Sequence, residues 1–202
     1  MRLARVLAGF ALAGTATAVH VLAGFALAAT TTAVHAGPAR VALVIGNAAY
    51  ADAPLRNPVN DARAVAESLR ALGFTVTLAE NLKAEEMRSA LRGFALGARD
   101  AEVRLFYFAG HGLQLRGRNY LLPVGTRLQN ETDILGKTAD ATELVEQLGG
   151  IAAGANVVII DACRSHPVFA PGTRRMWAAR PGMAEVPPPT GTVVAFSTRP
   201  GQ

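Results

Sequence analysis

The sequence predicts one α/β domain with a mainly parallel sheet and helices on both faces. Half of the 202 residues are hydrophobic, which suffices for one well-packed core. Apolar runs of strand length alternate along the chain with segments of helical periodicity. Such alternation implies right-handed crossovers, and therefore parallel strands covered by helices.

The first half of the domain predicts two strands and two helices. The run "RVALVIG" at 40–46 is apolar throughout, as a strand buried on both faces requires. Asn57 can cap a helix that has Pro58 at its first position and ends at Gly73. A strand at 74–80 follows. The next helix spans Leu82–Leu96, and its inward positions are Met87, Leu91, Phe94 and Ala95.

The second half predicts three more strands. The third, "VRLFYFAG" at 103–110, ends in "GHG", and a hairpin about Gly117 follows it. A short helix, Ala141–Leu148, leads to the fourth strand at 156–161. After a loop rich in Pro, Gly and Arg, residues 192–198 supply the fifth strand.

The N-terminal segment predicts a secretory leader over residues 1–36. Residues 6–20 recur almost unchanged at 21–35, a tandem duplication within this segment. Two arginines precede the apolar run, and "VHA" provides a small-residue cleavage site before Gly37. We expect an exported protein, periplasmic or secreted. The alternative is an uncleaved membrane anchor, because no charged residue lies between Arg5 and Arg40.

Charge and cysteine content exclude several functional classes. Twenty Lys and Arg residues stand against 15 Asp and Glu, but the basic residues are scattered and few aromatic residues accompany them. The sequence therefore predicts a solvated surface and no nucleic-acid partner. One cysteine cannot form an internal disulfide, and a structural zinc cage is not expected. Likewise, no glycine-rich phosphate-binding motif follows any strand.

One histidine and the single cysteine stand out by their positions. His111 follows the third predicted strand, and Cys163 follows the fourth. Ligand sites in parallel sheets lie at the carboxyl ends of the strands, so these residues can meet if the strands are neighbours. An imidazole can take the proton of a thiol and thereby activate it. Taken alone, Cys163 would more often be a buried apolar residue, and His111 a hydrogen-bonded loop residue.

The motifs around these residues resemble the caspase and metacaspase cysteine peptidases. A strand ending in "FAGHG" precedes one ending in "DAC", with 52 positions between His111 and Cys163. The segments "RVALVIGN", "LRNPVNDA" and "NYLLPV" are also similar to family segments. The similarity covers roughly residues 40–198 and implies a caspase-like three-layer sandwich, with a catalytic domain over 37–202.

The resemblance also implies roles for individual residues. His111 is then the general base and acid, Cys163 the nucleophile, and the N–H groups of Gly112 and Cys163 the oxyanion hole. Asp161 matches a metacaspase position that binds a basic side chain. Cleavage after Arg or Lys in protein or peptide substrates is therefore expected. On the residues alone, Asp161 could equally cap a loop.

Several features depart from the family or remain open. The chain ends at Gln202, soon after the fifth strand, whereas relatives continue through another helix and strand. No cofactor is expected. Some metacaspases bind calcium, but Asp133 and Asp140 are too isolated to assign a site. The loop 164–190, which carries Arg174, Arg175 and Arg180, is either a self-cleavage site or a flexible connection, and the second is favoured.

Two other functional classes stay open at the level of sequence. The first is a catalytically inactive interaction module that keeps the fold. The second is a Cys/His amidohydrolase or acyltransferase that acts on a non-peptide substrate. Turnover of peptides, and its loss without Cys163, would separate these alternatives from the endopeptidase.

Overall fold

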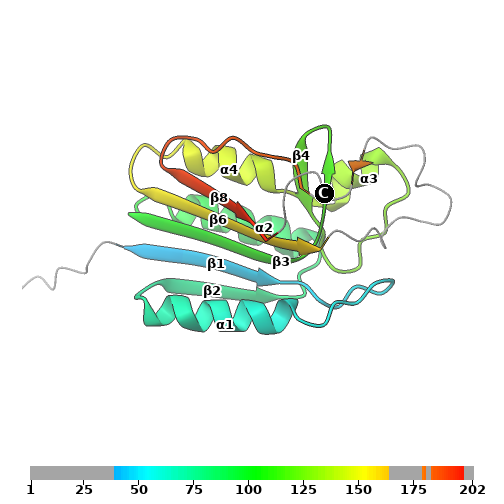
Figure 1. Cartoon of the computed structure of the whole chain (residues 1–202), viewed down its shortest axis with the longest axis horizontal. Helices are drawn as coiled ribbons and strands as arrows, with labels where there is room; N and C mark the ends of the chain where they lie inside the picture. The colour runs from blue at the N-terminus through cyan, green and yellow to red at the C-terminus, as the bar shows by residue number, and fades with distance from the viewer. Residues whose placement is uncertain (1–38, 164–178, 181–182, 198–202) are drawn as a thin grey trace, which may run out of the picture. The chain divides into compact units, whose positions relative to one another are not determined.

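The structure is a computed structural model that describes residues 39–163, 179–180 and 183–197. The predicted leader, residues 1–36, lies outside the described residues. Five parallel strands form the centre of the domain in the order β2-β1-β3-β6-β8 (Figure 1). These strands are β1 (Arg40–Gly46), β2 (Thr75–Glu80), β3 (Val103–Leu115), β6 (Ala155–Cys163) and β8 (Thr192–Phe196).

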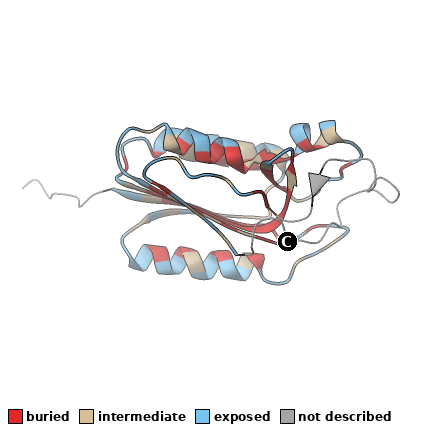
Figure 2. Ribbon diagram, turned by 45° about the horizontal axis from the view of Figure 1, so that its top comes forward, coloured by how far each residue is buried: buried red, intermediate tan, exposed pale blue. Residues whose placement is uncertain are grey.

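Helices cover both faces of this sheet, as the sequence predicts. One face packs against α1 (Pro58–Ala71). The opposite face packs against α2 (Ala84–Gly97) and α4 (Ala141–Gly149), and Figures 1 and 2 show this three-layer arrangement. Alternate residues of the central strands therefore enter two separate cores. Phe106 and Phe108 face α2 and α4, whereas Leu105 and Tyr107 face α1.

A smaller antiparallel unit extends from the end of β3. It comprises β4 (Arg118–Leu121), β5 (Ala139–Asp140) and β7 (Ala179–Arg180). The hairpin between β3 and β4 turns at Arg116 and Gly117, which both have positive φ values, 52° and 80°. The short helix α3 (Glu131–Lys137) packs beside it through Ile134. This unit has its own apolar cluster, which fixes the hairpin against the sheet.

Some predicted boundaries are wrong, each for a local reason. The third strand does not end at Gly110: β3 continues through His111 to Leu115, because its second half pairs with β4. The Asn57 side chain makes no capping hydrogen bond. The second helix begins two residues later than predicted, where the Glu86 carboxylate accepts the backbone N–H of Lys83 at 2.8 Å.

Gly46 lets α1 approach the end of β1. A Cβ atom at this position would lie 2.5 Å from the backbone oxygen of Pro58 and 2.7 Å from the Cβ of Ala62. Both atoms belong to α1, so a side chain here would push the helix from the sheet. We expect Gly46→Ala to lower the free energy of unfolding by about 1–3 kcal/mol in urea denaturation.

Gly93 provides the matched control for this substitution. It lies inside α2, and a Cβ there would meet no atom within 4 Å. Gly93→Ala should therefore stabilise the protein by about 0.5–1 kcal/mol, through helix propensity alone. Equal effects of the two substitutions would contradict the close packing of α1 on β1.

Candidate active site

The backbones of His111 and Cys163 lie side by side. β3 and β6 are neighbours, and their register makes the Cα atoms of these two residues partners. Neighbouring strands lie about 4.8 Å apart. The two residues are 52 positions apart in the sequence, so the sheet topology alone brings them together. The side chain of Cys163 lies outside the part of the chain that the structure describes.

The imidazole of His111 is buried and fixed through one of its nitrogens. Only 1% of the residue is exposed, and Nε2 lies 2.8 Å from the carbonyl oxygen of Ala53. Because a carbonyl can only accept, Nε2 carries the proton and donates it. In the neutral ring, Nδ1 is then the acceptor. This buried nitrogen has no hydrogen-bond partner among the described residues.

Burial also lowers the pKa of His111. Removal of the ring from water disfavours its charged form, and the hydrogen bond to Ala53 opposes this effect only in part. The imidazole of His111 therefore stays neutral to a lower pH than that of an ordinary histidine. A neutral histidine with a free Nδ1 is suited to accept a proton.

Tyr50 holds the backbone around this histidine. Its hydroxyl accepts the N–H of His111 at 3.1 Å and donates to the carbonyl oxygen of Leu122 at 2.8 Å. The two rings lie 4.4 Å apart at an interplanar angle of 55°. Tyr50 and Ala53 belong to the loop after β1, so this loop fixes both the backbone and the ring of His111.

The glycines on either side of His111 allow close packing. A Cβ at Gly110 would lie 2.7 Å from the hydroxyl of Tyr50. At Gly112 it would lie 3.0 Å from the Cβ of Ala162 and 3.1 Å from the Sδ of Met183. Gly112 is also the first β3 residue that pairs with β4. The "GHG" motif thus allows close packing at the point where β3 stops pairing with β6 and begins to pair with β4.

Asp161 lies near a buried tyrosine, Tyr107, on which a second carboxylate, Asp61, also acts. Tyr107, which is 6% exposed, donates a hydrogen bond to Asp161. Burial, together with the negative charges of Asp161 and Asp61, raises the pKa of Tyr107 to about 12. Asp61 comes from α1. Two carboxylates from distant parts of the chain therefore act on the same hydroxyl.

Comparison with known proteins identifies the family. The model of the caspase domain family of peptidases matches residues 39–202, which is most of the chain. The chain belongs to the caspase-domain family. This assignment agrees with the caspase-like resemblance and the three-layer fold predicted from the sequence.

The curated relatives of this caspase domain are much longer proteins. It is 31% identical over 126 residues to the human mucosa-associated lymphoid tissue lymphoma translocation protein 1, and 30% identical to the mouse homologue. Each alignment covers 62% of this chain but only 15% of the relative. The similarity therefore concerns one segment of those proteins.

Solved structures share the fold of this caspase domain at low sequence identity. The Drosophila initiator caspase Dronc gives a TM-score of 0.53 at 13% identity, covering 79% of this chain and 55% of Dronc. The protein GSU0716 from Geobacter sulfurreducens gives a TM-score of 0.50 at 18% identity, covering 63% and 52% of the two chains. Both comparisons support the architecture of the sheet and its covering helices.

Sequence reasoning missed several residues around the site of this caspase domain. Tyr50, Ala53 and Asp61 lie in or just after the loop that follows β1, and only the folded chain brings them to β3 and β6. A weak signal exists for Asp61, because "NDA" is part of the quoted "LRNPVNDA" segment. Tyr50 and Ala53 carry no such signal.

Asn119 anchors the segment that leads to β8. Its side-chain amide donates to the carbonyl oxygen of Ala184 at 2.9 Å and accepts the N–H of the same residue at 2.6 Å. The neighbouring Met183 is buried and packs near Gly112. The chain that follows the cysteine loop thus returns to β4 beside the site.

Other candidates from the sequence lie outside this arrangement. Four residues of the loop after Cys163 are outside the described residues: Arg164, His166, Arg174 and Arg175. The backbone of Arg180 belongs to β7, opposite Gln114 of β3.

The described residues do not fit a cation site. They contain no group of three or more His, Cys, Asp or Glu side chains that could hold a metal ion. The Asp133 carboxylate accepts the backbone N–H of Gln129 and forms an ion pair with Lys137. The Asp140 carboxylate caps the N-terminus of α4 and forms an ion pair with Arg118. In the same part of the chain, no helix has the length and apolar character needed to cross a bilayer.

Proposed function

We propose that this caspase domain is a cysteine endopeptidase that cleaves after Arg or Lys. The observation that carries the proposal is the register of β3 and β6. It pairs the backbone of a buried, neutral histidine with that of the chain's single cysteine. The free Nδ1 of His111 supplies the acceptor that such a cysteine requires.

The reaction proceeds through an acyl-enzyme. Nδ1 of His111 takes the thiol proton of Cys163, and the thiolate attacks the carbonyl carbon of the scissile bond. The N–H groups of Gly112 and Cys163 stabilise the resulting oxyanion. His111 then gives its proton to the leaving amine. A water molecule, deprotonated at the same Nδ1, releases the acid product and restores the thiol.

Two carboxylates select the basic side chain. Asp161 lies two residues before Cys163 on β6, and Asp61 acts on the same Tyr107 hydroxyl from α1. A guanidinium or ammonium group would pair with these carboxylates, whereas an aspartate side chain would be repelled. The Tyr107 hydroxyl donates a hydrogen bond to Asp161, and the charges of both carboxylates act on it.

Paired fluorogenic peptides test this function. The full chain is incubated with peptides that end in Arg, Lys or Asp before the reporter group, beside a Cys163→Ala control. We expect turnover of the Arg and Lys peptides and none in the control. Turnover that survives Cys163→Ala would exclude the mechanism, and a preference for Asp would exclude the selective role of Asp161.

The pH dependence of the reaction follows from the lowered pKa of His111. The free enzyme needs the neutral imidazole, which persists below pH 6.5 because burial disfavours the charged ring. We expect the acidic limb of kcat/KM against pH to lie below 6.5. A limb at or above that value would contradict a buried, neutral His111.

The same shift links pH to stability. The unfolded chain binds a proton at His111 more readily than the folded chain does, so the stabilising contribution is full above pH 6.5. It is lost as pH falls from 6.5 through the lower folded pKa. Denaturation of His111→Gln over this pH range should show a weaker dependence than that of the parent chain.

A further inference from the structure

The first residues of the loop after β1 are bound by a side chain at the end of β2. This loop holds both the backbone and the ring of His111. Asn81 follows directly on β2, and its Oδ1 atom accepts the backbone N–H groups of Ala48 and Ala49, each at 2.9 Å. The end of β2 is thereby linked to the loop that carries the contacts of His111.

The loop closes on Ala48, one of the two residues that Asn81 binds. The Ala48 carbonyl oxygen accepts the N–H groups of Tyr50 at 2.9 Å and Leu55 at 3.0 Å. Ala53, whose carbonyl oxygen receives the ring proton of the histidine, lies between the two ends of this closed segment. A shift of Ala48 would therefore move Tyr50 and Ala53 together.

The backbone conformation at Asn81 also favours an asparagine. Its φ is 53°, in the left-handed region, which asparagine, aspartate and glycine adopt more easily than other residues. The Asn81 N–H donates to the carbonyl oxygen of Gly46 at 2.9 Å, so the residue still joins β2 to β1. Both bonds to the loop use the side-chain oxygen and not the amide nitrogen. An aspartate can therefore accept the same two N–H groups.

A second asparagine makes the reciprocal connection. Asn47, directly after β1, is fully buried, and its Oδ1 atom accepts the N–H of Leu82 at 2.9 Å. Its amide nitrogen donates to the carbonyl oxygen of Leu122 at 3.1 Å. The N–H of Leu122 in turn donates to the carbonyl oxygen of His111 at 2.9 Å. The loops after β1 and β2 thus hold each other, and both asparagines lead to His111.

We infer that Asn81 is a positioning residue for His111. By holding Ala48 and Ala49, it keeps the Ala53 carbonyl oxygen where it accepts the proton on Nε2, so that Nδ1 stays the proton acceptor. This role rests on the proposed function, in which Nδ1 takes the thiol proton. Asn81 itself contacts no reacting atom in that mechanism.

Two substitutions of Asn81 separate the side-chain oxygen from the backbone conformation. Glycine adopts the left-handed φ freely but offers no oxygen to the loop, whereas aspartate keeps both. With an Arg peptide we expect kcat of Asn81→Gly to fall about tenfold, with KM unchanged, because the proton acceptor is misplaced. Asn81→Asp should keep kcat within about twofold of the parent chain, because it restores the acceptor.

A proton NMR spectrum tests the positioning without any turnover. The Nε2 proton of His111, held by Ala53, should exchange slowly enough to give a resolved imidazole N–H signal, which His111→Gln lacks. We expect this signal in the parent chain and in Asn81→Asp, and its loss in Asn81→Gly. An inactive parent chain with the same pattern of signals would contradict the proposed function and still support the role of Asn81.

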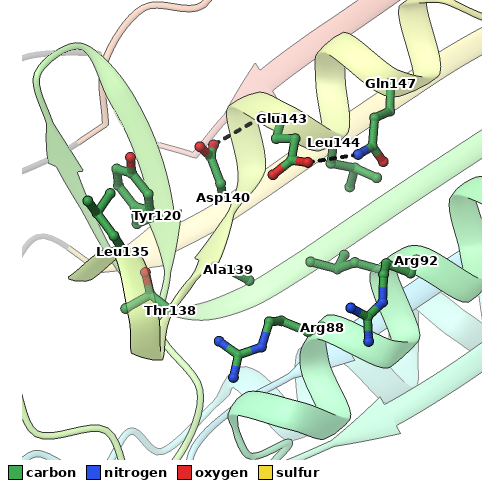
Figure 3. A pocket seen from close by; sticks show the side chains of 11 residues that line it. Arg88, Arg92, Tyr120, Leu135, Thr138, Ala139, Asp140, Glu143, Leu144 and Gln147 are labelled. Carbon is green, nitrogen blue, oxygen red and sulfur yellow. Dashed lines mark hydrogen bonds between the residues drawn. The ribbon is translucent and has the colours of Figure 1, made fainter. Parts of the chain in front are cut away.

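Gln147→Gly is the matched control for the loss of a side-chain hydrogen bond. Figure 3 shows Gln147 of α4 donating to Glu143, at 3.0 Å, beside a cavity between α2 and α4. The helix α4 leads to the start of β6, and about 25 Å of strand separate that start from Cys163. Gln147→Gly should lower the midpoint of urea denaturation, because glycine weakens a helix, but leave kcat and the imidazole signal unchanged.

Three results would overturn this role for Asn81. The first is an unchanged kcat and an unchanged imidazole signal in Asn81→Gly. The second is an equal loss in Asn81→Gly and Gln147→Gly, which would reduce the effect to general stability. The third is an Asn81→Asp variant as impaired as Asn81→Gly, because the oxygen would then not be the group that matters.

Amide hydrogen exchange in the parent chain gives a test that needs no variant. The N–H of Ala49, an exposed residue, should be protected because it donates to Asn81. Exchange at the rate of an unstructured chain would exclude this bond, whether or not Asn81→Gly folds.

Discussion

Replacing His111 with glutamine is expected to lower kcat for an Arg peptide by about 10²–10⁴-fold. Glutamine can still fill the buried position and donate to the carbonyl oxygen of Ala53. It offers no basic nitrogen, however, to take the thiol proton of Cys163. The loss should appear mainly in kcat and not in KM, because the carboxylates proposed to bind the substrate remain in place.

Thiol reactivity gives a second readout of the same substitution. Cys163 is the only cysteine, so alkylation of the whole chain by iodoacetamide reports on this residue alone. In the parent chain the rate should rise at lower pH than for a free thiol, whose pKa is about 8.5. In His111→Gln the rate should rise near that value. Unchanged alkylation and unchanged kcat together would show that His111 is not the base.

Replacing Asp161 with asparagine is expected to lower kcat/KM for Arg and Lys peptides by about 10²-fold. The amide keeps the shape of the side chain but not the charge that we propose pairs with the substrate. Asp61→Asn should cause a smaller loss, and the double variant should lose most of the preference for basic peptides. Asp100→Asn, in an exposed loop, is the control and should leave kcat/KM unchanged.

The pKa of Tyr107 measures the effect of Asp161→Asn without any substrate. Its pKa, about 12 in the folded chain, is raised first by burial and then by the charges of Asp161 and Asp61. Asp161→Asn should lower this pKa in an ultraviolet titration, although burial should keep it above 10. A lower kcat/KM with an unchanged tyrosine titration would place Asp161 away from Tyr107 and contradict the proposed pocket.

The strands could be predicted because the relevant signals are local. Continuous apolar runs indicate buried parallel strands. The motif "DAC" ends β6, whereas "GHG" lies inside β3, where the pairing with β4 begins. The sequence could not establish that β3 and β6 are neighbours. The structure shows that they pair, with His111 opposite Cys163.

The residues that hold His111 could not be predicted, because their roles depend on tertiary contacts. Tyr50 and Ala53 act only because the loop after β1 folds back onto β3. The helix α3 escaped prediction because seven residues give too short a periodic pattern. The extension of β3 to Leu115 was missed because glycines on both sides of His111 suggest a loop, whereas here they permit close packing.

The hydrogen bonds between Asn119 and Ala184 bear on how the polypeptide would tolerate a backbone cut. The strand β6 ends at Cys163, and the chain is held at β7, which pairs with β3, and again at Ala184, before β8 joins β6. A nick between residues 164 and 178 would therefore yield two fragments that still share one sheet and one core. They would separate on a denaturing gel but migrate together in gel filtration, as a noncovalent heterodimer made from one gene product.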